Sequence, residues 1–281
     1  MRLKSASRFF DTCPVYDAYT GTLLFKVQTS TFLESAKEGS TAARRVISVD
    51  PSFSIPTHNC LLALDQLMVV GAANPDEWAG SAIRKAYWTK LVTDNFTLLT
   101  PAQAALNSAG SPVFGSKQFL KVSSNALTDS EYDPYWAISI SKNTTLERGY
   151  FLRSANTLYR VRAAYVDLDG FKTCEADEVD VNVVYASFST TSSYDPVTDT
   201  FLPGLVTTTG VLLDLQKSYV KTSGTDLPFI SGDMTLLVSK AALVVNIGQE
   251  FSISDSRYKG RWRVIGLLEE HDAWNLHIRR V

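Results

Sequence analysis

The segment Tyr159–Val179, YRVRAAYVDLDGFKTCEADEV, contains two strand patterns joined by a turn. Polar and apolar residues alternate in its first half, which is the two-residue period of a strand with one buried face. The dipeptide Asp169-Gly170 then favours a tight hairpin turn, because glycine adopts the positive φ that such turns need. We therefore predict a β-hairpin here, and antiparallel β-structure as the basic unit of the chain.

The same period recurs along the chain in short segments rich in β-branched and aromatic residues. We expect further strands at Leu23–Gln28, Trp136–Lys142, Val179–Tyr185 and Arg261–Ile265. A short helix is predicted as well, with Thr100 as its N-cap, Pro101 as its first residue and an end near Asn107. Helical structure is thus expected to be a minor component.

The stretch that follows Asn74 admits two interpretations. Its apolar residues between Trp78 and Tyr87 would fall on one face of a helix. Gly80 lies inside the stretch, however, and Arg84–Leu91 also has the composition of a strand. We favour a loop that leads into a strand.

These patterns predict a mostly β fold of small antiparallel β-barrel or sandwich modules, with few short helices and extended arms. We place an N-terminal β region at residues 1–112, a middle β-hairpin region at 113–185, and a C-terminal arm plus small β-barrel at 186–281. The Ser/Thr-rich stretch at 186–200 contains Phe188 and Tyr194. It is therefore expected to be an extended arm or long loop and not a free linker.

The composition is that of a folded protein, with 281 residues, a net charge of −2, 45% hydrophobic and 20% charged residues. It excludes a disordered chain and a fibrous rod, and it argues against a general nucleic-acid coat while permitting a local basic patch. Cys13, Cys60 and Cys174 are far apart and odd in number, which favours reduced thiols. No secretory signal or membrane-spanning apolar run is found, so we expect synthesis in the cytoplasm and no membrane partner.

Motifs of catalysis and metal binding are incomplete. The lysine of Gly110–Lys117 is displaced by one position from a phosphate-binding loop, and the Asp167–Gly170 stretch lacks the remaining ligands of a calcium loop. Glu269–Asp272 and His277 offer metal ligands, but a charged hairpin turn explains them better. We therefore predict no enzymatic activity, no catalytic residue, no metal and no cofactor.

The segment Asp129–Trp136, DSEYDPYW, keeps two alternatives open, because it places acids beside aromatic residues. The Asp129–Asp133 acids are candidates for the carboxylate pair of a polysaccharide hydrolase. The aromatic residues of Tyr132–Trp136 are candidates for the sugar-binding surface of a tail-fibre or lectin-like β-sandwich.

Two strands carry arginines that alternate with apolar residues. Arg160 and Arg162 point away from Tyr159 and Val161, and the same alternation separates Arg261 and Arg263 from Trp262 and Val264. In a ring of several copies, such faces are candidates to line a channel and contact DNA phosphates. In a monomer they are the solvated side of a sheet.

The C-terminal segment carries a recurring combination of motifs. Gly232-Asp233-Met234 precedes the apolar stretch LLVSKAALVV, followed by Gly248–Ile253, by Gly260–Gly266 (GRWRVIG) and by Trp274–Arg279. A weaker echo occurs in the first region, at Leu67–Gly71, Asn74–Gly80 and Ile83-Arg84. This combination resembles the head-to-tail joining proteins of tailed bacteriophages, the adaptor or stopper proteins of the neck.

The resemblance implies a virion structural protein that joins the capsid portal to the tail by forming a homo-oligomeric ring around a DNA channel. Its implied partners are copies of itself, the portal or other neck and tail proteins, and DNA in transient non-specific contact. The family has no catalytic residues to carry over. Tryptophan is enriched in interface hot spots, so the candidate interface anchors are Trp78, Trp88, Trp136, Trp262 and Trp274.

Overall fold

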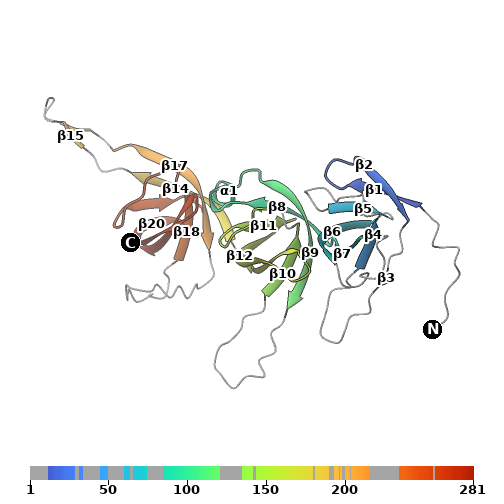
Figure 1. The fold of residues 1–281 in the computed structure, drawn as a ribbon. Helices are drawn as coiled ribbons and strands as arrows, with labels where there is room; N and C mark the ends of the chain where they lie inside the picture. The colour runs from blue at the N-terminus through green and yellow to red at the C-terminus, as the bar shows by residue number, and fades with distance from the viewer. Residues whose placement is uncertain are drawn as a thin grey trace, which may run out of the picture. The chain divides into compact units, whose positions relative to one another are not determined.

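A computed structural model shows the predicted mostly β fold with barrel modules (Figure 1). It describes residues 12–28, 32–33, 45–49, 60–63, 66–74, 85–120, 135–141, 144–179, 181–189, 193–195, 197, 200–202, 204–214, 234–255 and 257–281. The described strands form a seven-stranded sheet, two closed six-stranded barrels and a two-stranded ribbon.

The first sheet, here the N-terminal sheet, has the strand order β2-β1-β5-β6-β7-β4-β3 with antiparallel neighbours. Its strands are β1 (Thr12–Asp17), β2 (Leu23–Gln28), β3 (Phe32–Leu33), β4 (Arg45–Val49), β5 (Cys60–Ala63), β6 (Gln66–Asn74) and β7 (Lys85–Leu91). The strand predicted at Leu23–Gln28 is confirmed. The strand favoured after Asn74 is confirmed as β7, and the loop expected before it lies outside the described residues.

The middle barrel closes in the order β10-β13-β12-β11-β8-β9. It contains β8 (Asp94–Leu99), β9 (Ser111–Leu120), β10 (Tyr135–Ile140), β11 (Phe151–Ser154), β12 (Thr157–Val166) and β13 (Lys172–Val179). The predicted β12–β13 hairpin is confirmed: Gly170 has a φ of +77°, and the Asp167 carboxylate accepts a hydrogen bond from the Phe171 amide at 2.9 Å.

The predicted helix is confirmed as α1 (Pro101–Ala105). The Thr100 hydroxyl accepts from the Gln103 amide at 3.2 Å, and the Gln103 side chain accepts from the Thr100 amide at 2.9 Å. This reciprocal pair satisfies two amides that would otherwise lack partners at the start of the helix. The helix ends before the predicted Asn107, because that residue takes a left-handed φ of 51°.

The C-terminal barrel closes in the order β14-β17-β18-β21-β20-β19. It contains β14 (Val181–Ser189), β17 (Val206–Asp214), β18 (Met234–Ser239), β19 (Glu250–Ile253), β20 (Gly260–Glu270) and β21 (Ala273–Arg280). The strand predicted at Val179–Tyr185 divides between the end of β13 and the start of β14. The apolar stretch LLVSKAALVV continues as a strand only to Ser239, because the chain then turns: the Ala242 amide donates to the Ser239 carbonyl oxygen at 3.1 Å.

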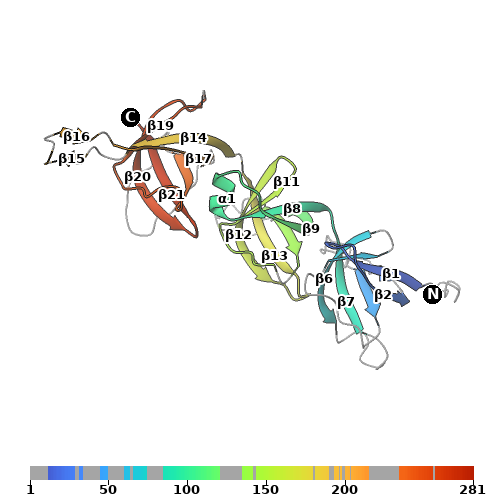
Figure 2. The same ribbon diagram turned by 90° about the horizontal axis from the view of Figure 1, so that it is seen from above.

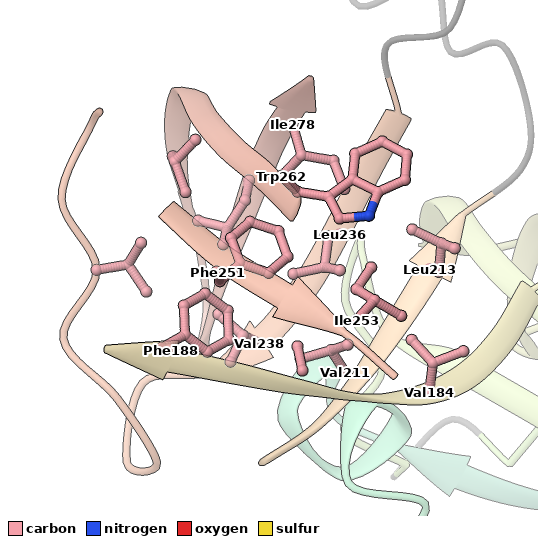
Figure 3. Packing of buried hydrophobic residues seen from close by; sticks show 14 residues of the cluster. Val184, Phe188, Val211, Leu213, Leu236, Val238, Phe251, Ile253, Trp262 and Ile278 are labelled. Carbon is pink, nitrogen blue, oxygen red and sulfur yellow. The ribbon is translucent and has the colours of Figure 1, made fainter. Parts of the chain in front are cut away.

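The core of the C-terminal barrel consists of inward-facing residues from every strand (Figure 3). Phe188 and Phe251 stack with their ring centroids 4.6 Å apart. The Trp262 indole is 5% exposed and donates its N–H to the Tyr258 carbonyl oxygen at 3.1 Å. The buried ring therefore keeps a hydrogen-bond partner, as indoles in cores generally require.

The chain separates into two compact units, each made of several segments. One unit comprises residues 1–97, 112–148 and 161–178, and the other comprises 98–111, 149–160 and 179–281. The predicted boundaries after residues 112 and 185 fall inside β9 and β14. The sheets themselves change between Leu91 and Asp94 and between Val179 and Val181.

Candidate functional site

The β14–β17 hairpin extends beyond the barrel that it helps to build. The two strands pair from Val181 with Asp214 to Ser189 with Val206, and β15 (Ser193–Asp195) pairs with β16 (Thr200–Leu202) further along the same hairpin. Figures 1 and 2 show the β15–β16 ribbon beyond the end of the barrel. We call the described residues among 189–206, which include β15 and β16, the arm.

Apolar side chains are exposed on the hairpin and its arm. Val197 is 89% exposed, and Leu205, Val206 and Tyr185 are also exposed. The alternate residues of β14 point into the core, where Val184, Ala186 and Phe188 are buried. A run of exposed apolar side chains on a projecting element is typical of a surface that binds another protein.

The base of the hairpin is held rigidly within the second unit. Helix α1 packs against β17 and β18. A Cβ atom on Gly210 would lie only 3.2 Å from the Ala105 carbonyl oxygen. Leu212 and Leu237 are buried in one cluster with Ala105. The arm therefore projects from a fixed support.

The candidate tryptophan anchors occupy different environments. Trp262 lies in the barrel core, so its side chain is not available to a partner. Trp274 packs against the same core, and the Lys240 ammonium lies 5.0 Å from its ring centroid. Trp88 is half-buried in β7. Trp78 lies outside the described residues.

Trp136 is the candidate anchor with an aromatic neighbour. It is half-buried, and its ring centroid lies 5.0 Å from that of Phe119, which is 42% exposed. The Lys117 ammonium lies 4.9 Å from the Trp136 ring centroid. The exposed Phe119 ring and the accessible part of Trp136 together offer a stacking surface.

The four candidate arginines differ in their acidic partners. Within the second unit, Arg160 donates to both carboxylate oxygens of Glu270, at 2.7 and 2.8 Å. Arg162 pairs with Asp177 in the first unit. Each of these cations thus has a carboxylate to itself. Arg261 and Arg263 instead share the single carboxylate of Glu250.

A buried polar cluster in the first unit was missed by the sequence analysis. The Lys90 ammonium lies 2.8 Å from the Ser139 hydroxyl and 3.3 Å from the Asp167 carboxylate, which also accepts from Thr173 at 3.0 Å. A serine–lysine nucleophile requires an accessible hydroxyl and a neutral amine. Ser139 is 5% exposed and Lys90 is ion-paired. The cluster is therefore suited to joining β7 to β10 and not to catalysis.

The charged turn predicted at Glu269–Asp272 is confirmed, and its residues make structural contacts. Glu269 pairs with Lys240, and the Asp272 carboxylate accepts from the Ala102 amide at 3.0 Å. Across the described ranges, no three histidine, cysteine, aspartate or glutamate residues gather closely enough to hold a metal ion. None of the described helices has the length and hydropathy to span a membrane.

The comparisons place the chain in no known group. No protein-family model, curated protein or solved structure matches it. The Asp129–Asp133 acids and Tyr132 lie outside the described residues. Any functional conclusion therefore depends on the surfaces described above.

Proposed function

We propose that this chain is a non-enzymatic virion structural protein that joins a capsid portal to a tail. It assembles with copies of itself into a ring around a DNA channel and binds the portal or other neck and tail proteins. The observation that carries the proposal is the arm, which projects from the C-terminal barrel and exposes Val197, Leu205 and Val206. The proposed family is the one that the C-terminal motifs resemble, the neck proteins of tailed bacteriophages.

The closed topology of the C-terminal barrel explains why this barrel would associate through an arm. Strand edges recruit partner strands, and closing a sheet into a barrel removes those edges. A closed barrel must then bind its neighbours through outer faces or through projecting elements, whereas the N-terminal sheet ends at the edge strands β2 and β3. A hairpin that reaches the next copy makes a head-to-tail contact, which closes into a ring when the rotation permits.

Sedimentation of the wild type and two variants tests the proposal. In the first variant, residues 190–205 are replaced by Asn-Gly, a two-residue turn that joins Ser189 to its partner Val206. Leu168→Ser is the matched control, since Leu168 is a fully exposed apolar residue outside the arm. We expect the wild type and Leu168→Ser to form the same large oligomer and the shortened chain to remain monomeric with unchanged thermal stability.

Two results would count against this function. A wild-type chain that stays monomeric at every concentration would contradict self-assembly. A shortened chain that assembles like the wild type would remove the arm from the mechanism.

The Phe119–Trp136 pair supports a second candidate, a carbohydrate-binding module. Sugars stack on exposed aromatic rings, and Lys117 lies beside this pair. Tryptophan fluorescence titrated with a glycan panel tests it. Binding that Trp136→Ala abolishes would favour this candidate, and no response to any glycan would dismiss it.

A further inference from the structure

We propose that one outer face of the C-terminal barrel binds the phosphate backbone of duplex DNA without sequence preference. This face, here the basic face, consists of Arg261 and Arg263 of β20 and Arg279 of β21. The inference deepens the proposed function, on which it rests for the presence of DNA. It concerns a surface separate from the arm.

The strand register places the three arginines together. Arg263 pairs directly with Arg279 of β21 and with Glu250 of β19, and Arg261 pairs with Ser252. Residues that face each other across an antiparallel pair point to the same side of the sheet. Trp262, which lies between Arg261 and Arg263, points into the core. The arginines therefore project outward from a rigid barrel wall.

Positive charge is in excess on this face. The side chains of Arg261 and Arg263 are 73% and 51% exposed, and both donate to Glu250. Their hydrogen bonds lower the pKa of the Glu250 carboxyl, with Arg263 contributing most. Glu250 therefore stays ionised, yet one carboxylate neutralises only one of two guanidinium groups.

The neighbouring sequence adds to the imbalance. Segments 250–263 and 279–280 contain six basic residues and two acidic ones, in a chain whose net charge is −2. Arg257 and Lys259, both exposed, lie in the loop between β19 and β20. Arg280 reaches the same loop, where it donates to the Lys259 carbonyl oxygen at 3.1 Å. Basic side chains thus outnumber acidic ones in these segments, although Arg280 pairs with Trp262 and so lies on the other side of β21 from Arg279.

The chemistry of the face selects a phosphate ligand. Guanidinium groups bind phosphate oxygens through paired N–H donors. Glu250, Ser252 and Ser187, which the register also places on this face, are polar. A protein that contacts the phosphate backbone of DNA but not the bases binds with an affinity that depends on salt concentration and not on DNA sequence. Duplex DNA is the polyanion that the proposed channel would contain.

Fluorescence anisotropy with a labelled random-sequence duplex tests the inference. We expect the double variant Arg261→Gln/Arg263→Gln to bind roughly tenfold more weakly at 50 mM salt. The slope of log affinity against log salt should fall by about two, because two fewer phosphates are neutralised on binding. Arg162→Gln is the matched control, because Arg162 is also exposed on a barrel strand but has Asp177 to itself. It should bind like the wild type.

A second variant reverses the sign of the effect. Glu250→Gln removes the carboxylate and leaves both arginines, so it should bind DNA more tightly than the wild type. Circular dichroism of each variant verifies the fold. Equal binding by the wild type and the double-arginine variant, or a strong preference for one DNA sequence, would overturn the inference.

Sedimentation separates this inference from the proposed function. The double-arginine variant should assemble like the wild type, because the arm is intact. A monomeric wild type whose DNA binding is still abolished in the double variant would count against ring assembly and support the basic face. If the double-arginine variant forms a ring and binds DNA as well as the wild type does, the result would support ring assembly and count against the basic face.

Discussion

The middle and C-terminal barrels share a topology but differ in their surfaces. Both are closed and six-stranded. In the middle barrel, Lys117 pairs with Asp94 and Arg162 pairs with Asp177, so each of these two cations has its own acid. In the C-terminal barrel, Arg261 and Arg263 share Glu250. The arm also projects from the C-terminal barrel alone among the described strands (Figures 1 and 2).

This difference indicates a division of roles. Barrel closure satisfies the backbone and encloses a core, and it leaves function to the side chains and loops that face outward. The Lys90 cluster joins the middle barrel to β7 of the N-terminal sheet. The C-terminal barrel has two exposed arginines that share one carboxylate, and it carries the arm. Under the proposed function, the C-terminal barrel is therefore the module that contacts partners.

Among the substitutions that compare the two barrels, the largest loss of stability is expected in the core of the C-terminal barrel. Trp262→Ala removes a buried ring and its hydrogen bond to Tyr258, which should lower the free energy of unfolding by about 3–5 kcal/mol. Trp136→Ala in the middle barrel should have a smaller effect, since that ring is only half-buried. Urea denaturation measures both, and equal decreases in the free energy of unfolding would contradict the assigned burial.

A smaller destabilisation is expected from Gly71→Ala in the first unit. The added Cβ would lie 2.2 Å from the Asp169 carbonyl oxygen, so the backbone must shift. The expected destabilisation is at the upper end of about 1–3 kcal/mol. Gly248→Ala is the control, because its Cβ would meet no atom and only its φ of +88° adds strain, at about 1 kcal/mol. If thermal denaturation shows that Gly248→Ala lowers stability more than Gly71→Ala does, the close approach of Gly71 to the Asp169 carbonyl oxygen is refuted.

The two ion pairs of β12 provide a finer test. Glu270→Ala removes the carboxylate that pairs with the partly buried Arg160 and that accepts from the Asn275 amide. We expect a destabilisation of about 1.5–3 kcal/mol. Asp177→Asn breaks the more exposed pair with Arg162 and should cost less than about 1 kcal/mol. Chemical denaturation of both variants would show comparable destabilisation if the two pairs were equivalent.

The smallest effect concerns pH. Because the pKa of the Glu250 carboxyl is lowered in the folded protein, its ion pairs stabilise the fold at pH values above the pKa of this carboxyl in the unfolded chain. That contribution disappears as pH falls through the lowered pKa. Protonation also frees both arginines, so DNA affinity should rise as pH falls through this range. Anisotropy titrations should show this rise in the wild type and a weaker one in Glu250→Gln.

Local signals were sufficient to predict the elements but not their assembly. The Asp169-Gly170 turn and the Thr100 cap depend on neighbouring residues, so the sequence reveals them directly. The partners of Lys90 and Arg160 are Asp167 and Glu270, which are remote in the chain. Each of these two pairs joins a residue of one sheet to a strand or turn of another, so the packing of one sheet against another decides the contact. For the same reason, the alternating pattern of Arg160/Arg162 could not be distinguished from that of Arg261/Arg263 before the strand order was known.

The break of the LLVSKAALVV strand illustrates the same limit. Its composition favours one long strand, but the amide of Ala242 donates to the Ser239 carbonyl oxygen and the chain turns away after Ser239. The sequence also pointed to tryptophans as anchors, whereas Trp262 is a core residue. An aromatic residue on a half-buried strand has the same local pattern in either role. Only its neighbours across the barrel distinguish the two roles.

Negative-stain imaging of the purified wild-type chain tests the central claim most directly, because it shows whether copies associate and in what symmetry. We predict closed rings with a central hole, which disappear when residues 190–205 are replaced by Asn-Gly. Compact trimers without a hole, or single chains at every concentration, would contradict the account.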